Sequence, residues 1–288
     1  MGEIYEGWEG SFLYGAEITP GTPVVPATAF GYVKNVNVQS AAGLEEEGAV
    51  GTWKPVSLEE GILEVGGSCE ILPINATALL LAKRNASTGK LGSYTFHATG
   101  GGAGVNHTGC KINQLRGSVD AGGRLRMNMD WFALGAVDNA AIAAVIPTDK
   151  DIFNWAECAH SLSGEIAGME FTINQNLQRR AVISGTGTVL PVTGQSRAPY
   201  RIKEGRQSVR ATLRFFERPS QNVIADVLTE IASMTLIATG DVTADVLTFT
   251  FSNGKPARRE NTFSESSESL WPLEIVFRDW DVAFTDTP

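Results

Sequence analysis

Two stretches of the chain carry the same apolar pattern at a fixed spacing. Three pairs of residues share this spacing: Glu60 and Glu204, Val65 and Val209, and Ile71 and Phe215. A fixed spacing between similar segments is typical of a chain that contains copies of one structural unit. The repeat therefore predicts two related units in sequence, and not one body built around a single site.

The residues around the repeat predict the same order of elements in both copies. An alternating strand comes first, and a long loop containing Gly and Pro follows it. The repeated strand, a helix and a closing strand that ends in Asp-Trp come next. The first strand is expected at 33–38 in the first copy and 169–174 in the second, and the long loop at 43–55 and 179–199. The helix is expected at 75–84 and 220–231, and the closing strand at 125–131 and 273–280. Asp130 and Asp279, which precede the two tryptophans, are expected to have matching structural roles.

Apolar and polar residues alternate along the predicted strands. Met127, Met129 and Trp131 take every second position from 127 to 131, and Cys69 is in phase with Ile71. Such alternation is typical of antiparallel sheets with one face on a core. Charged residues make up only 19% of the chain, and a low charge is hazardous for exposed strand edges in a monomer. We therefore expect a mainly β protein that assembles.

No group of residues predicts catalysis, a cofactor or a metal site. His97, His107 and His160 lack the spacing of metal ligands. The glycine-rich stretch 100–104 is expected to be a flexible loop, since no strand-then-helix pattern surrounds it. Ser252-Asn253-Gly254-Lys255 is expected to be a hairpin turn. The sequence thus predicts a protein that is not an enzyme.

The overall charge and the termini exclude other classes. A net charge of −9 argues against a protein whose task is to hold phosphates. No apolar run is long enough to cross a membrane, and the first residues do not form a secretory signal. Three cysteines without a pairing pattern fit a reducing cytoplasm.

Charges of opposite sign occupy matching places in the two copies. The first long loop is acidic and the second begins with basic residues, and the repeated strands differ in the same way. The residues concerned are Glu45, Glu46 and Glu47 against Arg179 and Arg180, and Glu70 against Arg214. We predict contacts between like subunits, or between stacked rings of them, at these residues. The alternative is that the two loops are solvated hairpin tips.

Two segments resemble a known family, the long-tailed bacteriophage tail-tube (major tail) proteins. Residues 10–22 resemble the arm that begins these proteins, and residues 109–125 resemble their late hairpin. The resemblance implies tube-type β-sandwich or barrel units, each with one flanking α-helix, that join into a continuous barrel on oligomerisation. Some members carry two units per chain. For this chain it implies an arm at 1–30, flexible in the free subunit, and units at 31–148 and 149–288.

The resemblance also implies a function. The chain would be a structural virion protein of the tail, made in the host cytoplasm, which assembles with itself into a trimeric pseudo-hexameric ring or a hexamer. Stacked rings would form a tube with an acidic lumen through which DNA passes without specific binding. Its other partners would be the tape-measure protein and further tail proteins, without membrane insertion.

Two alternatives remain open at this stage. One is another β-rich virion protein, namely a tail terminator or a capsid decoration protein. The other is a carbohydrate-binding adhesin, for which Trp131, Trp271 and Trp280 would have to lie on a wet face.

Overall fold

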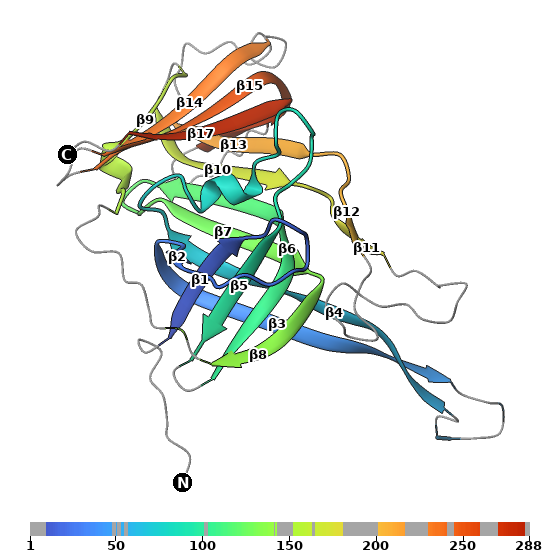
Figure 1. Ribbon diagram of the computed structural model, residues 1–288. Coiled ribbons are helices and arrows are strands. Elements are labelled where there is room, and N and C mark those ends of the chain that lie inside the picture. Colours follow the sequence, from blue (N-terminus) through green and yellow to red (C-terminus); the bar gives the residue numbers. More distant parts are fainter. Residues whose placement is uncertain are drawn as a thin grey trace.

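The protein is mainly β, as the alternation predicted (Figure 1). The computed structural model describes residues 10–47, 50, 53–54, 57–100, 103–140, 142, 152–162, 165–180, 201–216, 230–240, 245–259 and 270–285. Nearly all of the described strands belong to one 15-stranded sheet, which does not close into a barrel within these residues.

The strands of the N-terminal half form two layers that share one long strand, β6 (Ala103–Asp120). The first layer contains β3 (Tyr32–Glu47), β4 (Ser57–Leu72), β7 (Arg126–Ala133) and the C-terminal part of β6. The second contains β2 (Thr28–Ala29), β1 (Ser11–Ala16), β5 (Tyr94–Thr99), the N-terminal part of β6 and β8 (Gly135–Ala140). Trp131 joins the layers, because its ring centroid lies 5.4 Å from that of Phe12 and 5.3 Å from that of Phe96.

The strands of the C-terminal half also form two layers that share a long strand, β15 (Val246–Arg259). The first layer contains β10 (Ile166–Asn174), β13 (Ser208–Phe216), β16 (Leu270–Phe277) and the C-terminal part of β15. The second contains β9 (Cys158–His160), β14 (Ile231–Thr239), the N-terminal part of β15 and β17 (Asp279–Thr285). Phe171 packs between the layers, 5.0 Å from Phe249 and 5.2 Å from Phe251 between ring centroids.

Irregularities in the two shared strands fall at positions that the spacing of the sequence repeat relates to each other. Gly109 in β6 and Asn253 in β15 both have a left-handed backbone, with φ of 64° and 54°. The register of β6 shifts between Ile112 and Gln114, and that of β15 shifts between Pro256 and Arg258. Each strand thus bends as it passes from one layer to the other. The expected hairpin turn at Ser252–Lys255 is wrong, because these residues continue β15 through this bend.

The first expected helix is also wrong. Within 75–84 only a 3₁₀ turn, η2 (Leu79–Ala82), forms. Two of its hydrogen bonds span three residues, from the Leu81 N–H to the Ala78 carbonyl and from the Lys83 N–H to the Leu80 carbonyl, and one spans four, from the Leu80 N–H to the Ala76 carbonyl. The Asn75 side chain accepts the N–H of Thr77 at 2.9 Å and favours a turn there over a longer helix. Most of the second expected helix, 220–231, lies outside the described residues, and Ile231 begins β14.

Two further expectations are corrected. Much of the flexible arm at 1–30 is ordered, because Phe12, Leu13 and Tyr14 are buried in β1, which pairs with β5. Residues 1–9 lie outside the described residues. The two Asp-Trp pairs are not counterparts. Asp130 lies within β7, whereas Asp279 begins β17, after the preceding strand has ended at Phe277.

The Glu17 carboxylate fixes the bend of β6 against β5. One of its oxygens accepts the N–H of Gly109 at 2.9 Å and the hydroxyl of Thr95 at 2.8 Å. The other accepts the N–H of Gly21 and the hydroxyl of Ser93, both at 2.8 Å. Hydrogen bonds to a charged group are stronger than neutral ones. The four hydrogen bonds of this one carboxylate therefore contribute strongly to the stability of the first half.

We expect Glu17→Ala to lower the free energy of unfolding by about 3 kcal/mol or more, because four donors lose their acceptor. Chemical denaturation followed by tryptophan fluorescence measures this. Asp138→Ala, at an exposed position in β8, is the control and should change the value little. Equal losses in the two variants would contradict this role.

His107 makes the stability of the fold depend on pH. Its Nδ1 accepts the indole N–H of buried Trp131 at 3.2 Å, and burial lowers its pKa from 6.5 to about 4. Between these values the unfolded chain binds the proton and the folded chain does not. The contribution of His107 to the free energy of unfolding is therefore complete above pH 6.5. It decreases by up to about 3 kcal/mol as the pH falls to 4. In His107→Gln this part of the decrease should be absent. Denaturation curves across this range that run parallel for the two proteins would refute the assignment.

Candidate assembly surface

One face of the long first-layer sheet carries paired charges. We call it the polar face, and it consists of the side chains of β3, β4, β7, β6, β10, β13, β16 and the C-terminal part of β15 that point away from the core. Its ion pairs are Glu70 with Arg126 and Arg116 with Glu170, both at 3.4 Å, Arg210 with Glu274 at 2.5 Å, and Arg214 with Asp120. These groups are partly exposed, so each pair adds less than about 1 kcal/mol. These ion pairs give the polar face positive charges that each have a negative neighbour.

Glu70 and Arg214, which the repeat placed in matching positions, both lie on this face. The structure pairs each of them inside the chain, with Arg126 and Asp120 respectively, and not with each other. The sequence alone did not indicate Asp120 as a partner of Arg214. The two residues lie on β6 and β13, and they meet only because β10 pairs with both strands. A role of Glu70 and Arg214 between subunits stays a prediction.

A long hairpin of β3 and β4 extends from the body of the protein (Figure 1). The expected loop at 43–55 is shorter than predicted, because Glu45, Glu46 and Glu47 lie in β3 and pair with residues 59, 58 and 57 of β4. The side chains of these three glutamates lie outside the described parts, so their contacts stay a prediction. Near the tip, Trp53 is 89% exposed and the Lys54 ammonium lies 4.6 Å from its ring centroid.

Arg179 crosses back onto the N-terminal half. It lies in β11 (Gln178–Arg180), which pairs with β12 (Arg201–Lys203) where a long loop was expected; residues 181–200 lie outside the described residues. Its guanidinium donates to the Val65 carbonyl at 2.8 Å, lies 3.8 Å from the Glu64 carboxylate and covers the Phe132 ring at 4.0 Å. Arg180 is exposed and contacts Gln178 at 3.5 Å. Arg179 is thus engaged within the chain.

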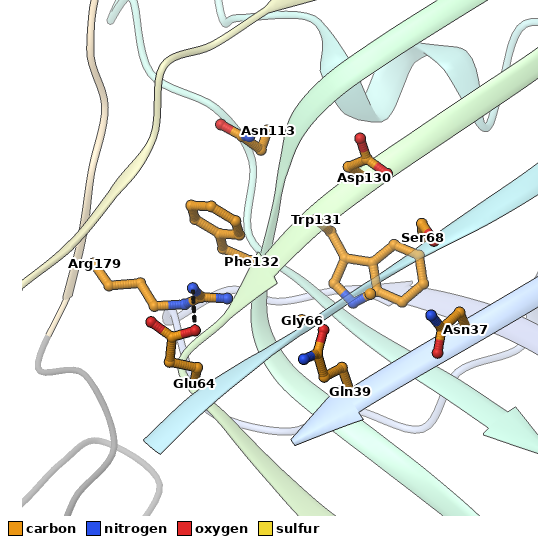
Figure 2. A pocket seen from close by; sticks show the side chains of 11 residues that line it. Asn37, Gln39, Glu64, Gly66, Ser68, Asn113, Asp130, Trp131, Phe132 and Arg179 are labelled. Carbon is orange, nitrogen blue, oxygen red and sulfur yellow. Dashed lines mark ion pairs between the residues drawn. The ribbon is translucent and has the colours of Figure 1, made fainter. Parts of the chain in front are cut away.

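Arg179 borders a polar cleft of about 340 Å³ (Figure 2). Asn37, Gln39, Glu64 and Asp130 also line it. Burial raises the pKa of Asp130, and the Arg116 charge opposes that shift. Gly66 leaves no room for a side chain, since a Cβ there would lie 2.5 Å from the Trp131 carbonyl oxygen and 3.0 Å from the Arg179 Nη2. The described residues contain no cluster that suits a metal ion, here or elsewhere.

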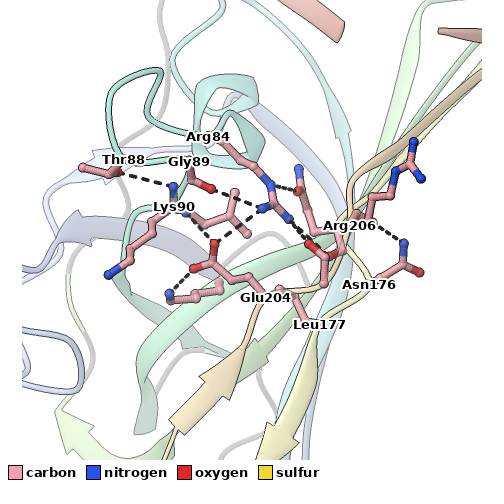
Figure 3. Close-up of polar contacts among 12 residues, drawn as sticks. Arg84, Thr88, Gly89, Lys90, Asn176, Leu177, Glu204 and Arg206 are labelled. Atoms are coloured by element: carbon pink, nitrogen blue, oxygen red, sulfur yellow. Dashed lines mark hydrogen bonds and ion pairs between the residues drawn. The ribbon is translucent and has the colours of Figure 1, made fainter. Parts of the chain in front are cut away.

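A second contact between the halves centres on Glu204 (Figure 3). Its carboxylate pairs with Lys111 and lies 3.9 Å from Arg84, and it accepts the N–H of Leu91 at 3.0 Å. Arg84 donates in turn to the Gln175 side chain at 2.7 Å and to the Gly205 carbonyl at 2.8 Å. We call these residues the Glu204 cluster. The sequence placed Glu204 in the repeat but gave no sign of its partners.

We expect Glu204→Ala to lower the free energy of unfolding by about 2–3 kcal/mol, because Lys111 and Arg84 would be left half-buried without their carboxylate. Glu170→Ala is the matched control: it also breaks a Glu–Arg pair between the halves, but both side chains are about half exposed, and the loss should stay below about 1 kcal/mol. Chemical denaturation of both variants decides between them. A larger loss for Glu170→Ala would contradict the importance given to the cluster.

Tryptophan placement argues against the adhesin alternative. Trp131 is 1% exposed and Trp280 is 2% exposed, so neither offers a ring to a sugar. The Trp271 side chain lies outside the described parts.

Comparison with known families shows to which family the chain is similar. The model of the phage tail tube protein family matches residues 7–216, which is more than half of the chain. No curated protein matches the sequence. Among the described residues, no helix is long and apolar enough to span a membrane.

Proposed function

The chain belongs to the phage tail tube protein family, and from that premise we propose that it carries two tube units and that three copies join edge to edge into a ring. The protein is a structural component of the virion tail. Stacked rings would then form the tube that conducts DNA to the host, in contact with the tape-measure protein and other tail proteins. The observation that carries this proposal is the repeated strand order.

Every described strand of the N-terminal half has a counterpart in the C-terminal half, except the two-residue β2. The order β3-β4-β7-β6 in one layer corresponds to β10-β13-β16-β15, and β1-β5-β6-β8 in the other corresponds to β9-β14-β15-β17. Bulges recur as well, between Val33 and Asn35 in β3 and between Ile166 and Gly168 in β10. Coincidence at this many irregular positions supports a doubled unit, with units near 31–148 and 149–288.

The way the two units meet suggests how chains meet. Inside the chain, the outermost first-layer strand of the first unit, β6, pairs with the outermost strand of the second, β10. At the two ends of this combined layer, β3 pairs with β4 alone and the C-terminal part of β15 pairs with β16 alone, among the described strands. An open edge is a template for another strand. A head-to-tail contact that repeats by rotation closes into a ring. Three chains would supply six units.

The polar face suits the lining of a DNA channel. We expected an acidic lumen, but the described part of this face carries both signs in pairs. Arginines that already have carboxylate partners offer little net positive charge to phosphates. Such a lining would let DNA pass without holding it, and the second layers would face outward.

The test is the mass and shape of assemblies of the purified full-length protein. We expect rings with a central hole and stacked tubes in negative-stain images, and a ring mass three times the 30.8 kDa of one chain. Mass photometry distinguishes three chains from six, and six would contradict the two-unit ring. Single rings that never stack would favour a tail terminator.

A further inference from the structure

We propose that Arg258 of one copy forms an ion pair with Glu64 of the next copy, across Ala41, and that this contact sets the register between chains. The proposal rests on the ring assembly above and names the residues that join its members. The partner is a second copy of this chain.

The junction inside the chain provides the template. Across it, β6 and β10 pair with Asp120 opposite Gly168 and Gln114 opposite Asn174. Gly168 in turn lies opposite Arg214 of β13. The ion pair between Arg214 and Asp120 therefore passes over the middle strand of three.

The residue in the middle must be small for this pair to form. A Cβ on Gly168 would lie 2.5 Å from the Arg214 Nη2 and 2.5 Å from the Asp120 Oδ1. Both atoms are the ends of flexible side chains and could shift to admit an alanine, whereas a longer side chain would separate the charges. The junction thus shows a usable arrangement: a cation and a carboxylate on the outer strands, with a small residue between them.

The repeated strand order predicts the same arrangement where the β15 edge of one chain meets the β3 edge of the next. The bulges of β3 and β10 align Val33 with Ile166, so that Ala41 corresponds to Asn174. The bulges of β6 and β15 align Ile112 with Pro256, so that Gln114 corresponds to Arg258. A chain-to-chain junction with the same register as the internal one sets Arg258 opposite Ala41 of the neighbour.

The strand beyond supplies the carboxylate. Ala41 lies opposite Glu64 of β4, on the polar face, and Arg258 lies opposite Glu274 on the same face of β16. The order Arg258, Ala41, Glu64 therefore repeats the pattern of a charge, a small residue and the opposite charge. The middle residue is alanine here and glycine in the template.

The two edges have complementary charge. At the β15 edge, Arg258 lies opposite Glu274 of β16, which forms an ion pair with Arg210 of β13 further from the edge. At the β3 edge, the Glu64 side chain is 60% exposed and forms an ion pair of 3.8 Å with Arg179, which leaves part of the carboxylate open to a second cation. The exposed Arg258 at one edge thus faces the exposed Glu64 carboxylate at the other, which favours head-to-tail over head-to-head contact.

Disulfide trapping tests the register in the full-length protein with Cys158→Ser, which removes the one cysteine that is not buried. The pair Ala41→Cys with Arg258→Cys should link chains into covalent multimers in mild oxidant. Gln114→Cys with Asn174→Cys, the internal counterpart, should link within one chain and is the positive control. Asn37→Cys with Arg258→Cys, out of register on the same face, should not link.

Charge reversal tests the ion pair itself. Arg258→Glu and Glu64→Arg should each abolish or strongly reduce ring formation in mass photometry, and the double variant should restore it. Lys90→Glu, the same reversal at an exposed position away from both edges, should assemble like the unaltered protein.

The outcomes separate this proposal from the assembly it rests on. If rings and tubes form but the 41/258 pair stays unlinked while the internal pair links, the register is wrong and the function stands. If Arg258→Glu assembles normally, or the double variant fails to recover although each variant folds, the ion pair is wrong. If the unaltered protein forms neither rings nor tubes, the proposed function fails, and the contact fails with it.

Discussion

Backbone pairing between β6 and β10 is the interaction on which the rest of the structure depends. It turns the first layers of the two halves into a single sheet, so the polar face runs without a break from β3 to β15. Among the described strands, it also leaves an edge at each end of that sheet. Strand edges offer a row of N–H and C=O groups that another strand can satisfy. A protein with few charges to protect such edges is therefore one that assembles.

Long shared strands make each half a sandwich without a separate connection between its layers. β6 and β15 serve both layers of their halves, which requires a bend in the middle of a strand. The left-handed backbone at Gly109 and Asn253 provides the bend, and glycine and asparagine are the residues that adopt it most readily. At Gly109 the Glu17 carboxylate holds the bent backbone in place. A local conformational choice thus sets the angle between layers.

Two side-chain contacts then hold the β10–β13 connection against the first half. Arg179 bonds to the middle of β4, and the Glu204 cluster joins the segment after β12 to β6 and to the residues before β5. The β3–β4 hairpin, which occupies the matching place in the first half, projects away from the body instead (Figure 1). Within the described residues, the connection between β10 and β13 thus contacts the first half, whereas the β3–β4 hairpin extends away from the body (Figure 1).

The sequence by itself determined the spacing of the repeat and the alternation of apolar and polar residues along several strands, such as 127–131 and 209–215. Alternation decides locally which side chains share a face, because successive side chains point to opposite faces whatever lies beside the strand. Cys69, Met127 and Trp131 are buried as the pattern predicted. Only the tertiary structure decided that 75–84 makes a single 3₁₀ turn, that 252–255 continues a strand, and that Arg179 and Glu204 reach the first half. Those outcomes depend on which strands become neighbours in the sheet. These strands are far apart in the sequence, and the local pattern of residues in one strand does not encode which other strand it pairs with.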